Sequence, residues 1–154
     1  TIFDYWSVDT IRRWRNGGKF DGKMLTEDQK HIYSVYQRIL TLCNKEKAIT
    51  EGEFFDLMYA NANGWRFNEH KQYTFLRKAG KELLFIIVNF DHISVDVAIN
   101  VPSHAFDFLQ IPQMDIYPAV DLLTGKTESI SLLPYKATEI SVEGYSGKIL
   151  KIKL

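Results

Sequence analysis

The spacing of apolar residues changes near residue 48, and this change constrains the fold more than any other feature of the sequence. Before it, apolar residues recur at intervals of three and four, as on an amphipathic helix. After it, they alternate with polar residues, which places successive side chains on opposite faces of a strand. A helical block followed by a strand block argues against alternating β-α-β units and a parallel sheet. We therefore divide the chain into a helical segment, residues 1–47, and a β domain, residues 48–154.

Two helices are predicted in the first segment. A short helix runs from a cap at Ser7 to about Arg15, where Asn16-Gly17-Gly18 ends it. A long helix follows Thr26, which forms a capping box with Gln29, and it continues to about Asn44. Its apolar stripe covers roughly 160° of the circumference, more than the ~100° of an ordinary surface helix. The stripe comprises Ile32, Val35, Tyr36, Ile39, Leu40, Leu42 and Cys43. A helix with so wide a stripe needs two partners, and the second indicates a neighbouring domain.

The β domain is predicted to contain about seven to eight short strands. The run 83–88 is apolar on both faces, as in a covered central strand, and it should form a hairpin with 73–78 across Gly80. The other predicted strands are 53–58, 95–101, 116–122, 128–132, 139–143 and 150–154, with a minor helical turn at 103–109. The predicted fold class is mainly β: an antiparallel two-sheet Greek-key sandwich preceded by two α-helices.

Composition excludes several classes of protein. The 154 residues correspond to about one domain, with 45% hydrophobic and 25% charged residues. Nineteen Lys and Arg balance nineteen Asp and Glu, so net charge favours neither nucleic acid nor an anionic membrane as a partner. The longest apolar run is six residues, too short to span a bilayer. A single cysteine, Cys43, excludes an internal disulfide and leaves the cellular compartment open. The start at Thr1 fits a processed product or a piece of a longer chain.

A search for catalytic or metal-binding motifs gives no strong candidate. The four histidines, at positions 31, 70, 92 and 104, fall on different predicted elements without metal-ligand spacing. Residues 18–24 resemble a phosphate loop but are one residue too short and carry Met24 where Ser or Thr should bind Mg²⁺. The sequence Gly144-Tyr145-Ser146-Gly147 lacks the flanking pattern of a nucleophile elbow, and a hairpin turn is favoured there. We therefore predict no catalytic residue, metal or cofactor in this chain.

One polar loop carries aromatic residues suited to sugars. Between two predicted strands it presents Tyr59, Trp65 and Phe67 among Asn, Gln, Glu and Arg side chains. A pyranose has an apolar C–H face that stacks on aromatic rings and hydroxyls that bind polar side chains. The loop could therefore bind a glucan chain, although rings that fold back on the core are the more common outcome.

A series of motifs along the first ninety residues resembles one known family. They are Ile2-Phe3-Asp4-Tyr5-Trp6-Ser7, Arg13-Trp14, Gly17-Gly18-Lys19-Phe20-Asp21-Gly22, Tyr36-Gln37-Arg38-Ile39-Leu40, Ala48-Ile49 with Gly52 and Phe54, Tyr73-Thr74-Phe75-Leu76-Arg77, and Phe85-Ile86-Ile87-Val88-Asn89-Phe90. In this order they resemble the C-terminal end of α-amylase-type enzymes, glycoside hydrolase family 13. In that family a (β/α)8 barrel precedes an all-β domain called domain C. One departure is Asp91, where family members often carry a small residue.

The resemblance implies a role outside catalysis. The family's Asp nucleophile, Glu acid/base and third Asp lie on barrel strands that precede this region, so no residue here matches them. The expected function is that of a non-catalytic C-terminal domain that stabilises the barrel of a retaining α-glucan-acting enzyme. The barrel of the same parent chain would be its partner, and the isolated fragment should self-associate. The alternatives are a starch- or maltooligosaccharide-binding module using Tyr59, Trp65 and Phe67, and a β-sandwich interaction domain unrelated to sugars.

Overall fold

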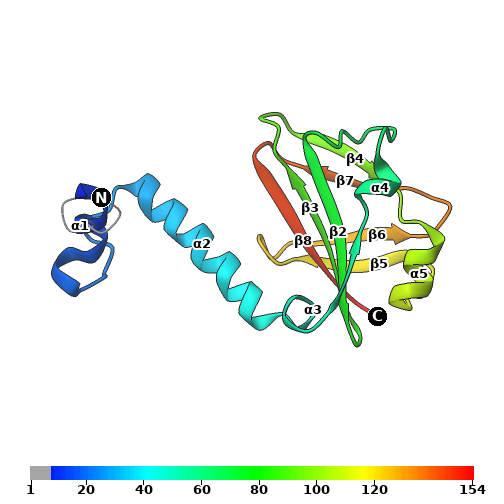
Figure 1. Cartoon of the computed structure of the whole chain (residues 1–154), viewed down its shortest axis with the longest axis horizontal. Coiled ribbons are helices and arrows are strands. Elements are labelled where there is room, and N and C mark those ends of the chain that lie inside the picture. The colour runs from blue at the N-terminus through cyan, green and yellow to red at the C-terminus, as the bar shows by residue number, and fades with distance from the viewer. Residues whose placement is uncertain (1–7) are drawn as a thin grey trace. The chain divides into compact units, whose positions relative to one another are not determined.

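Residues 8–154 are described by the computed structural model, so the predicted cap at Ser7 lies outside the described residues. The chain divides into two units with a boundary between Thr41 and Leu42 (Figure 1). The helices are α1 (Asp9–Arg15), the 3-10 turn η1 (Asn16–Gly18), α2 (Glu27–Lys45), α3 (Lys47–Thr50), α4 (Met58–Asn61) and α5 (Ser103–Leu109). The strands are β1 (Glu53–Asp56), β2 (Gln72–Ala79), β3 (Glu82–Asn89), β4 (Val95–Ile99), β5 (Met114–Asp121), β6 (Thr127–Leu132), β7 (Thr138–Val142) and β8 (Ser146–Lys153).

Local signals set the ends of the first two helices. Helix α1 ends at Asn16, whose left-handed backbone has φ 42°, and Gly17 continues with φ 65°. The capping box that begins α2 is confirmed. The Thr26 N–H donates to Gln29 Oε1 at 3.0 Å, and the Gln29 N–H donates to Thr26 Oγ1 at 3.3 Å. No residue of the 19-residue helix α2 is buried.

The strands form two antiparallel sheets. Six strands pair in the order β1-β2-β3-β8-β5-β6, and β4 pairs with β7. The predicted hairpin between β2 and β3 is confirmed, with Phe75 opposite Ile86 and Gly80 at φ 55° in the turn. Strand β8 is the last in sequence, yet it lies between β3 and β5 (Figure 1).

One apolar core joins the two sheets. Alternate residues of β3, including Leu83, Phe85 and Ile87, point into it together with Val97 of β4 and Ile140 of β7. The intervening residues Leu84 and Ile86 are buried in a second, smaller cluster on the opposite face of the same strand. The prediction of a central strand that is apolar on both faces is therefore confirmed, because β3 buries side chains on each side of the sheet.

The structure also corrects the predicted fold in three places. The described chain is 37% strand and 30% helix, so it is mixed rather than mainly β. The short helices α3 and α4 were not predicted; α4 begins within the segment 53–58, which was expected to be a strand throughout. The turn at Gly144 is not a hairpin turn, because it connects β7 of the small sheet to β8 of the large one.

Candidate functional site

The junction between α3 and β1 is held by two side chains of the large sheet. Arg77 of β2 donates from Nε to the Ala48 carbonyl and from Nη2 to the Gly52 carbonyl, both at 2.7 Å. The Ala48 N–H in turn donates to Glu82 Oε1 at 2.9 Å. A Cβ at Gly52 would lie 2.2 Å from the Ala48 carbonyl oxygen, so the close approach of these two backbones requires glycine. Arg77 and Glu82 thus fix α3 and the start of β1 against β2 and β3.

A lysine between two carboxylates completes this junction. Lys151 Nζ of β8 lies 2.5 Å from Glu46 Oε2 and 2.8 Å from Glu82 Oε2, and Glu46 is 4% exposed. Burial opposes ionisation of Glu82, but hydrogen bonds from Lys151 and the Ala48 N–H outweigh it and lower the pKa of this carboxyl. Burial likewise opposes the charge on Lys151, yet the two carboxylates raise its pKa. The cluster ties Glu46, directly after α2, to the centre of the sheet.

The large sheet keeps apolar side chains on the face that points away from the main core. We call this the outer face and define it by Phe54, Tyr73, Phe75, Ile86, Val88 and Ile149. Its rings adjoin one another, with Phe54 and Tyr73 at 5.3 and 5.7 Å from Phe75. Ile49 of α3 covers part of this face, while Phe54 and Tyr73 remain exposed. An apolar sheet face that is only partly covered is typical of a surface that packs against another body.

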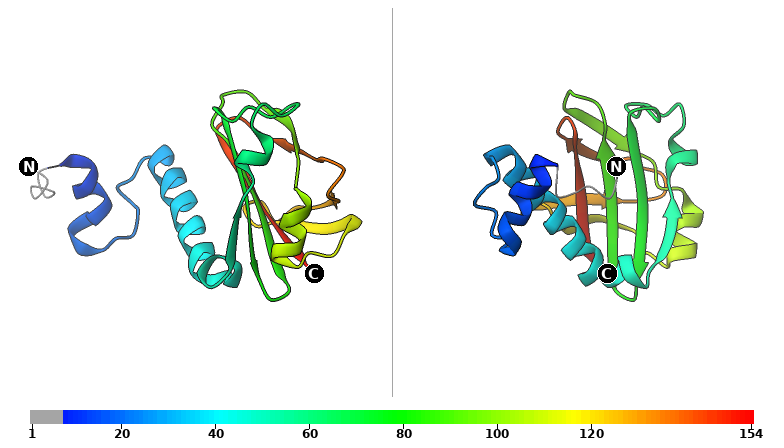
Figure 2. Two further views of the ribbon diagram at one scale, coloured as in Figure 1. Left: turned by 45° about the vertical axis from the view of Figure 1, so that its right-hand side comes forward. Right: turned by 60° about the vertical axis from the view of Figure 1, so that its left-hand side comes forward.

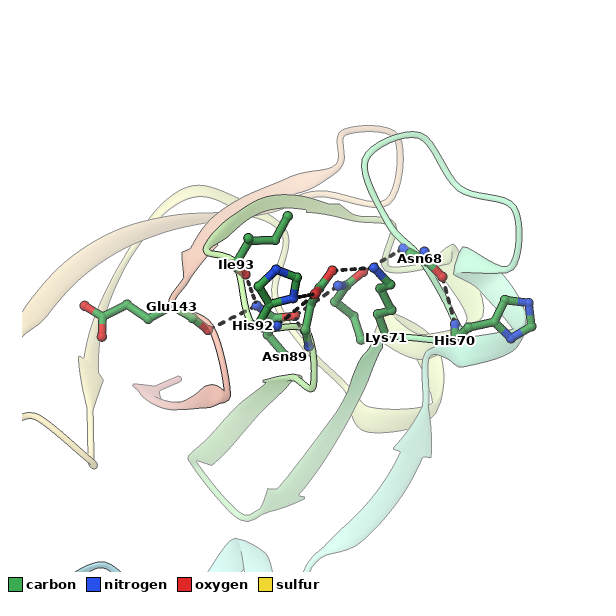
Figure 3. Close-up of polar contacts among 9 residues, drawn as sticks. Asn68, His70, Lys71, Asn89, His92, Ile93 and Glu143 are labelled. Atoms are coloured by element: carbon green, nitrogen blue, oxygen red, sulfur yellow. Dashed lines mark hydrogen bonds and ion pairs between the residues drawn. The ribbon is translucent and has the colours of Figure 1, made fainter. Parts of the chain in front are cut away.

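Asn89, at the end of the family-like motif, and Asp91, just after it, take part in a polar network (Figure 3). Asn89 Oδ1 accepts from Gln72, while its Nδ2 donates to the carbonyls of Ile93 and Glu143 at 2.8 and 3.1 Å. Asp91 accepts from Lys71 Nζ at 2.6 Å, and this hydrogen bond is the main cause of its lowered pKa.

This network brings two loops into direct contact. A Cβ at Gly144 would lie 2.2 Å from the His92 carbonyl oxygen, so the loops after β3 and β7 touch through their backbones. The His92 imidazole lies on the same carboxylate, with Nδ1 2.9 Å from Asp91 Oδ1. The polar side chains of this network are hydrogen-bonded or ion-paired within the fold, to one another and to backbone carbonyls. We therefore interpret the motif as structural.

The structure separates the three aromatic residues predicted to bind sugar. Phe67 is 6% exposed and belongs to the main core, so its inclusion in an exposed platform was wrong. Trp65 is 70% exposed, with the Arg66 guanidinium 5.0 Å from its ring centroid. Tyr59 is 55% exposed on α4 and packs against other aromatic residues. Phe67 follows the more common behaviour of apolar rings in a loop that covers a core.

The partners of Tyr59 were not found from the sequence. Its hydroxyl is hydrogen-bonded to His104 Nε2, and Phe55 lies near both rings, with centroid distances of 6.4 Å to Tyr59 and 5.4 Å to His104. Phe108 lies 5.9 Å from Phe55. Burial, followed by the nearby Asp56 charge, raises the pKa of Tyr59. His104 and Phe108 are four residues apart on α5, a spacing that places them on one helix face.

The described residues, 8–154, carry neither a metal-site nor a membrane-span signal. Within this range, no group of three or more His, Cys, Asp or Glu side chains is placed to hold a metal ion. In the same range every buried polar side-chain atom has a hydrogen-bond partner. None of the helices described is both long and apolar enough to cross a membrane.

Comparisons with known proteins show where this fold occurs. Neither a protein-family profile nor a curated sequence matches the chain. Among solved structures, a maltogenic α-amylase from Thermotoga neapolitana matches with a TM-score of 0.62 and 15% identity, over 86% of this chain and 27% of that enzyme. An α-amylase from Geobacillus thermoleovorans, solved with acarbose, matches with a TM-score of 0.57 and 12% identity, over 87% of this chain and 26% of that enzyme. The enzyme AmyP, solved with maltose, matches with a TM-score of 0.58 and 22% identity, over 86% of this chain and 23% of that enzyme.

These matches confirm, at the level of fold, the resemblance to α-amylase-type enzymes of glycoside hydrolase family 13. The chain has the fold of one part of these enzymes and spans about a quarter of the length of each of the three.

Proposed function

We propose that this chain is the C-terminal region of an α-amylase-type glycoside hydrolase. Residues 1–47 would be the last helices associated with the catalytic barrel, and residues 48–154 would be domain C, an antiparallel Greek-key sandwich. The region would have no catalytic role of its own and would stabilise the barrel. The partial match to α-amylases, over most of this chain but about a quarter of theirs, supports this assignment.

The single observation that carries the proposal is the uncovered apolar stripe of α2. Its exposed members include Ile32, Val35, Tyr36, Ile39 and Leu40. A helix gains most of its stability from packing of its apolar face, so 19 residues without one buried side chain imply a missing partner. The outer face of the large sheet is likewise incompletely covered, because Phe54 and Tyr73 remain exposed. A barrel in the parent enzyme would cover both surfaces.

In the proposed parent, catalysis takes place on the barrel. A retaining enzyme uses two carboxylates about 5 to 5.5 Å apart, one as nucleophile and one as acid/base. This division of labour agrees with a chain whose own conspicuous carboxylates, Glu46, Glu82 and Asp91, are held by lysines in structural clusters. The chain would therefore contribute stability, while the reactive acids come from the barrel.

Three measurements test the proposal. The 154-residue chain incubated with maltooligosaccharides should release no reducing sugar above buffer, and release at enzymatic rates would overturn it. The coding sequence that precedes Thr1 in a full-length transcript should encode a barrel with the nucleophile, acid/base and third acid. In that longer enzyme, charge on the α2 stripe, as in Tyr36→Glu with Leu40→Glu, should lower the melting temperature of the barrel.

A second candidate function is glucan binding at the loop of Trp65. The observation in its favour is the exposed indole beside the Arg66 guanidinium, a combination of ring face and hydrogen-bond donors suited to sugars. Electrophoresis in gels containing amylose tests it. Retardation that disappears in Trp65→Ala supports the candidate, and mobility equal to that in a plain gel contradicts it.

A further inference from the structure

Four aromatic side chains gather at the β1 edge of the large sheet. They are Phe55 from β1, Tyr59 from α4, and His104 and Phe108 from α5, and we call them the edge patch. Figure 2 shows in its right-hand view that α4 and α5 both lie beyond β1 at this edge. Tyr59 and Phe108 are 55% and 54% exposed. The three elements thus present a continuous group of rings to solvent.

The edge patch lies on the opposite side of β1 from the outer face. Phe55 pairs with Leu76 of β2, whose side chain points into the main core, whereas Phe54 pairs with Arg77 on the outer face. A body that packs against the outer face therefore leaves the edge patch open. A ligand of the edge patch would therefore be distinct from the barrel that we propose for the outer face.

The size of the edge patch favours a small ligand over a folded protein. A buried aromatic residue contributes roughly 150–250 Å² of surface, so two rings that are about half exposed present roughly 200 Å². Even with the edges of Phe55 and His104 added, the area falls well below the ~800 Å² that each partner of a stable protein complex buries. It is large enough to stack one or two sugar rings.

The chemistry of the edge patch fits a sugar better than a purely apolar ligand. The hydrogen-bonded Tyr59 hydroxyl and His104 imidazole bring polar atoms next to the Phe55 ring. A pyranose combines an apolar C–H face with hydroxyls at its edge, so it can stack on a ring and bind a polar atom beside it. A lipid chain would leave both polar atoms of this pair against hydrocarbon.

The tilt between the rings selects the shape of the glucan. The ring planes meet at 35° to 56° rather than lying in one plane. A β-1,4-linked glucan is a flat ribbon that stacks on coplanar rings, whereas an α-1,4-linked glucan curves from one residue to the next. We propose that the edge patch is a binding platform for an α-1,4-glucan chain, distinct from the Trp65 loop. The ligand class rests on the proposed function, whereas the site rests on the ring geometry.

The test is binding of maltoheptaose and soluble amylose to the 154-residue chain, with titration calorimetry and affinity gels. Phe108→Ala and Tyr59→Ala should each weaken binding about tenfold or more, the loss expected when a central stacking ring is removed. Tyr59→Phe keeps the ring and should lose less. The matched control is Tyr135→Ala, which removes an exposed ring outside the edge patch and should leave binding unchanged. Far-UV circular dichroism and melting curves check that each variant folds.

Each other outcome contradicts the platform. Absence of binding to either glucan, or equal binding of cellohexaose, would overturn it. Binding lost in Trp65→Ala and kept in Phe108→Ala would place the site on the loop instead. Failure of the platform can be told apart from failure of the proposed function. A chain that stabilises its barrel without binding amylose would contradict only the platform. A chain that binds amylose but whose upstream sequence encodes no barrel would defeat only the proposed function.

Discussion

Arg77 Nε donates a 2.7 Å hydrogen bond to the Ala48 carbonyl, 29 residues earlier in the chain. The same guanidinium reaches the Gly52 carbonyl through Nη2, so one side chain fixes both ends of the segment that leads from α3 into β1. Two carbonyls on one planar group require the fork geometry of arginine. This relationship explains why arginine, rather than any cation, occupies the family-like motif at this position.

Arg77→Lys should therefore destabilise the chain although it keeps the charge. A lysine ammonium cannot reproduce both planar hydrogen bonds, and we expect a loss of about 1–3 kcal/mol in the free energy of unfolding. Urea unfolding followed by circular dichroism measures it. The matched control is Lys78→Arg at the next position of β2, which should change stability by less than about 0.5 kcal/mol. Equal stability of Arg77→Lys and the original chain would contradict this role of the two Arg77 hydrogen bonds.

Asn89→Asp should lower the stability of the chain more than its small change in shape suggests. The substitution replaces the Nδ2 donor, which bonds the carbonyls of Ile93 and Glu143, by a carboxylate oxygen that faces both. We expect a loss of about 2–4 kcal/mol, because the site is buried and two acceptors lose their donor. Thermal unfolding should show it. At exposed Asn68 the oxygen accepts from the His70 N–H, so Asn68→Asp keeps that bond and should have little effect.

The cluster of Lys151, Glu46 and Glu82 should give stability a defined pH dependence. The lowered pKa of Glu82 means that its contribution is present above the ordinary value of 4.5 and is lost as the pH falls through the folded value. The raised pKa of Lys151 means that its contribution is present below 10.5 and is lost as the pH rises through the folded value. Urea midpoints measured across this pH range should fall at both ends.

Lys151→Met tests which group is responsible for this dependence. At neutral pH the variant leaves the buried Glu46 carboxylate without its cation, and we expect a loss of about 1–3 kcal/mol. Both ends of the pH profile should become flatter. Lys153→Met, at an exposed position two residues along the same strand, should retain the original profile. A Lys151→Met profile that overlays the original would rule out the cluster as its cause.

The α2 stripe should make the isolated chain associate with itself. Tyr36 and Leu40 are 65% and 59% exposed, and exposed apolar surface of this kind drives association in water. Sedimentation velocity should show species larger than a monomer at high concentration. Tyr36→Glu with Leu40→Glu should shift the chain toward monomer, whereas Ser34→Glu with Thr41→Glu adds the same charge on the opposite side of α2 and should not. A strict monomer at all concentrations would refute the prediction.

Much of the secondary structure was predictable because its signals are local. The capping box of Thr26 and Gln29, the alternation in β4 and the two-sided apolar run of β3 each identify their element without knowledge of the rest of the chain. Helices α3 and α4 have only four residues each and no periodic pattern, so the sequence did not predict them. The turn at Gly144 was misjudged because adjacency in sequence favours a hairpin, while the core shared by both sheets places β7 and β8 in different ones.

The candidate sites were less predictable because they depend on distant residues. Tyr59 was identified from its loop, but its partner His104 lies 45 residues away and was known only as one of four scattered histidines. The i, i+4 spacing of His104 and Phe108 on a predicted helical turn was the one signal that could have indicated the edge patch. Nothing local distinguished buried Phe67 from exposed Trp65, since burial is decided by the core that the loop covers.

The position of β8 also constrains how this sheet can form during synthesis. In the large sheet, residues 146–153 separate the β1-β2-β3 group from the β5-β6 hairpin, and both groups form their backbone hydrogen bonds with this strand rather than with each other. A nascent chain synthesised only as far as β7 therefore contains two separate strand groups, each with an unpaired edge strand. Such edges invite pairing with other chains until they are filled. Chaperone demand should consequently peak just before β8 emerges and fall once it inserts.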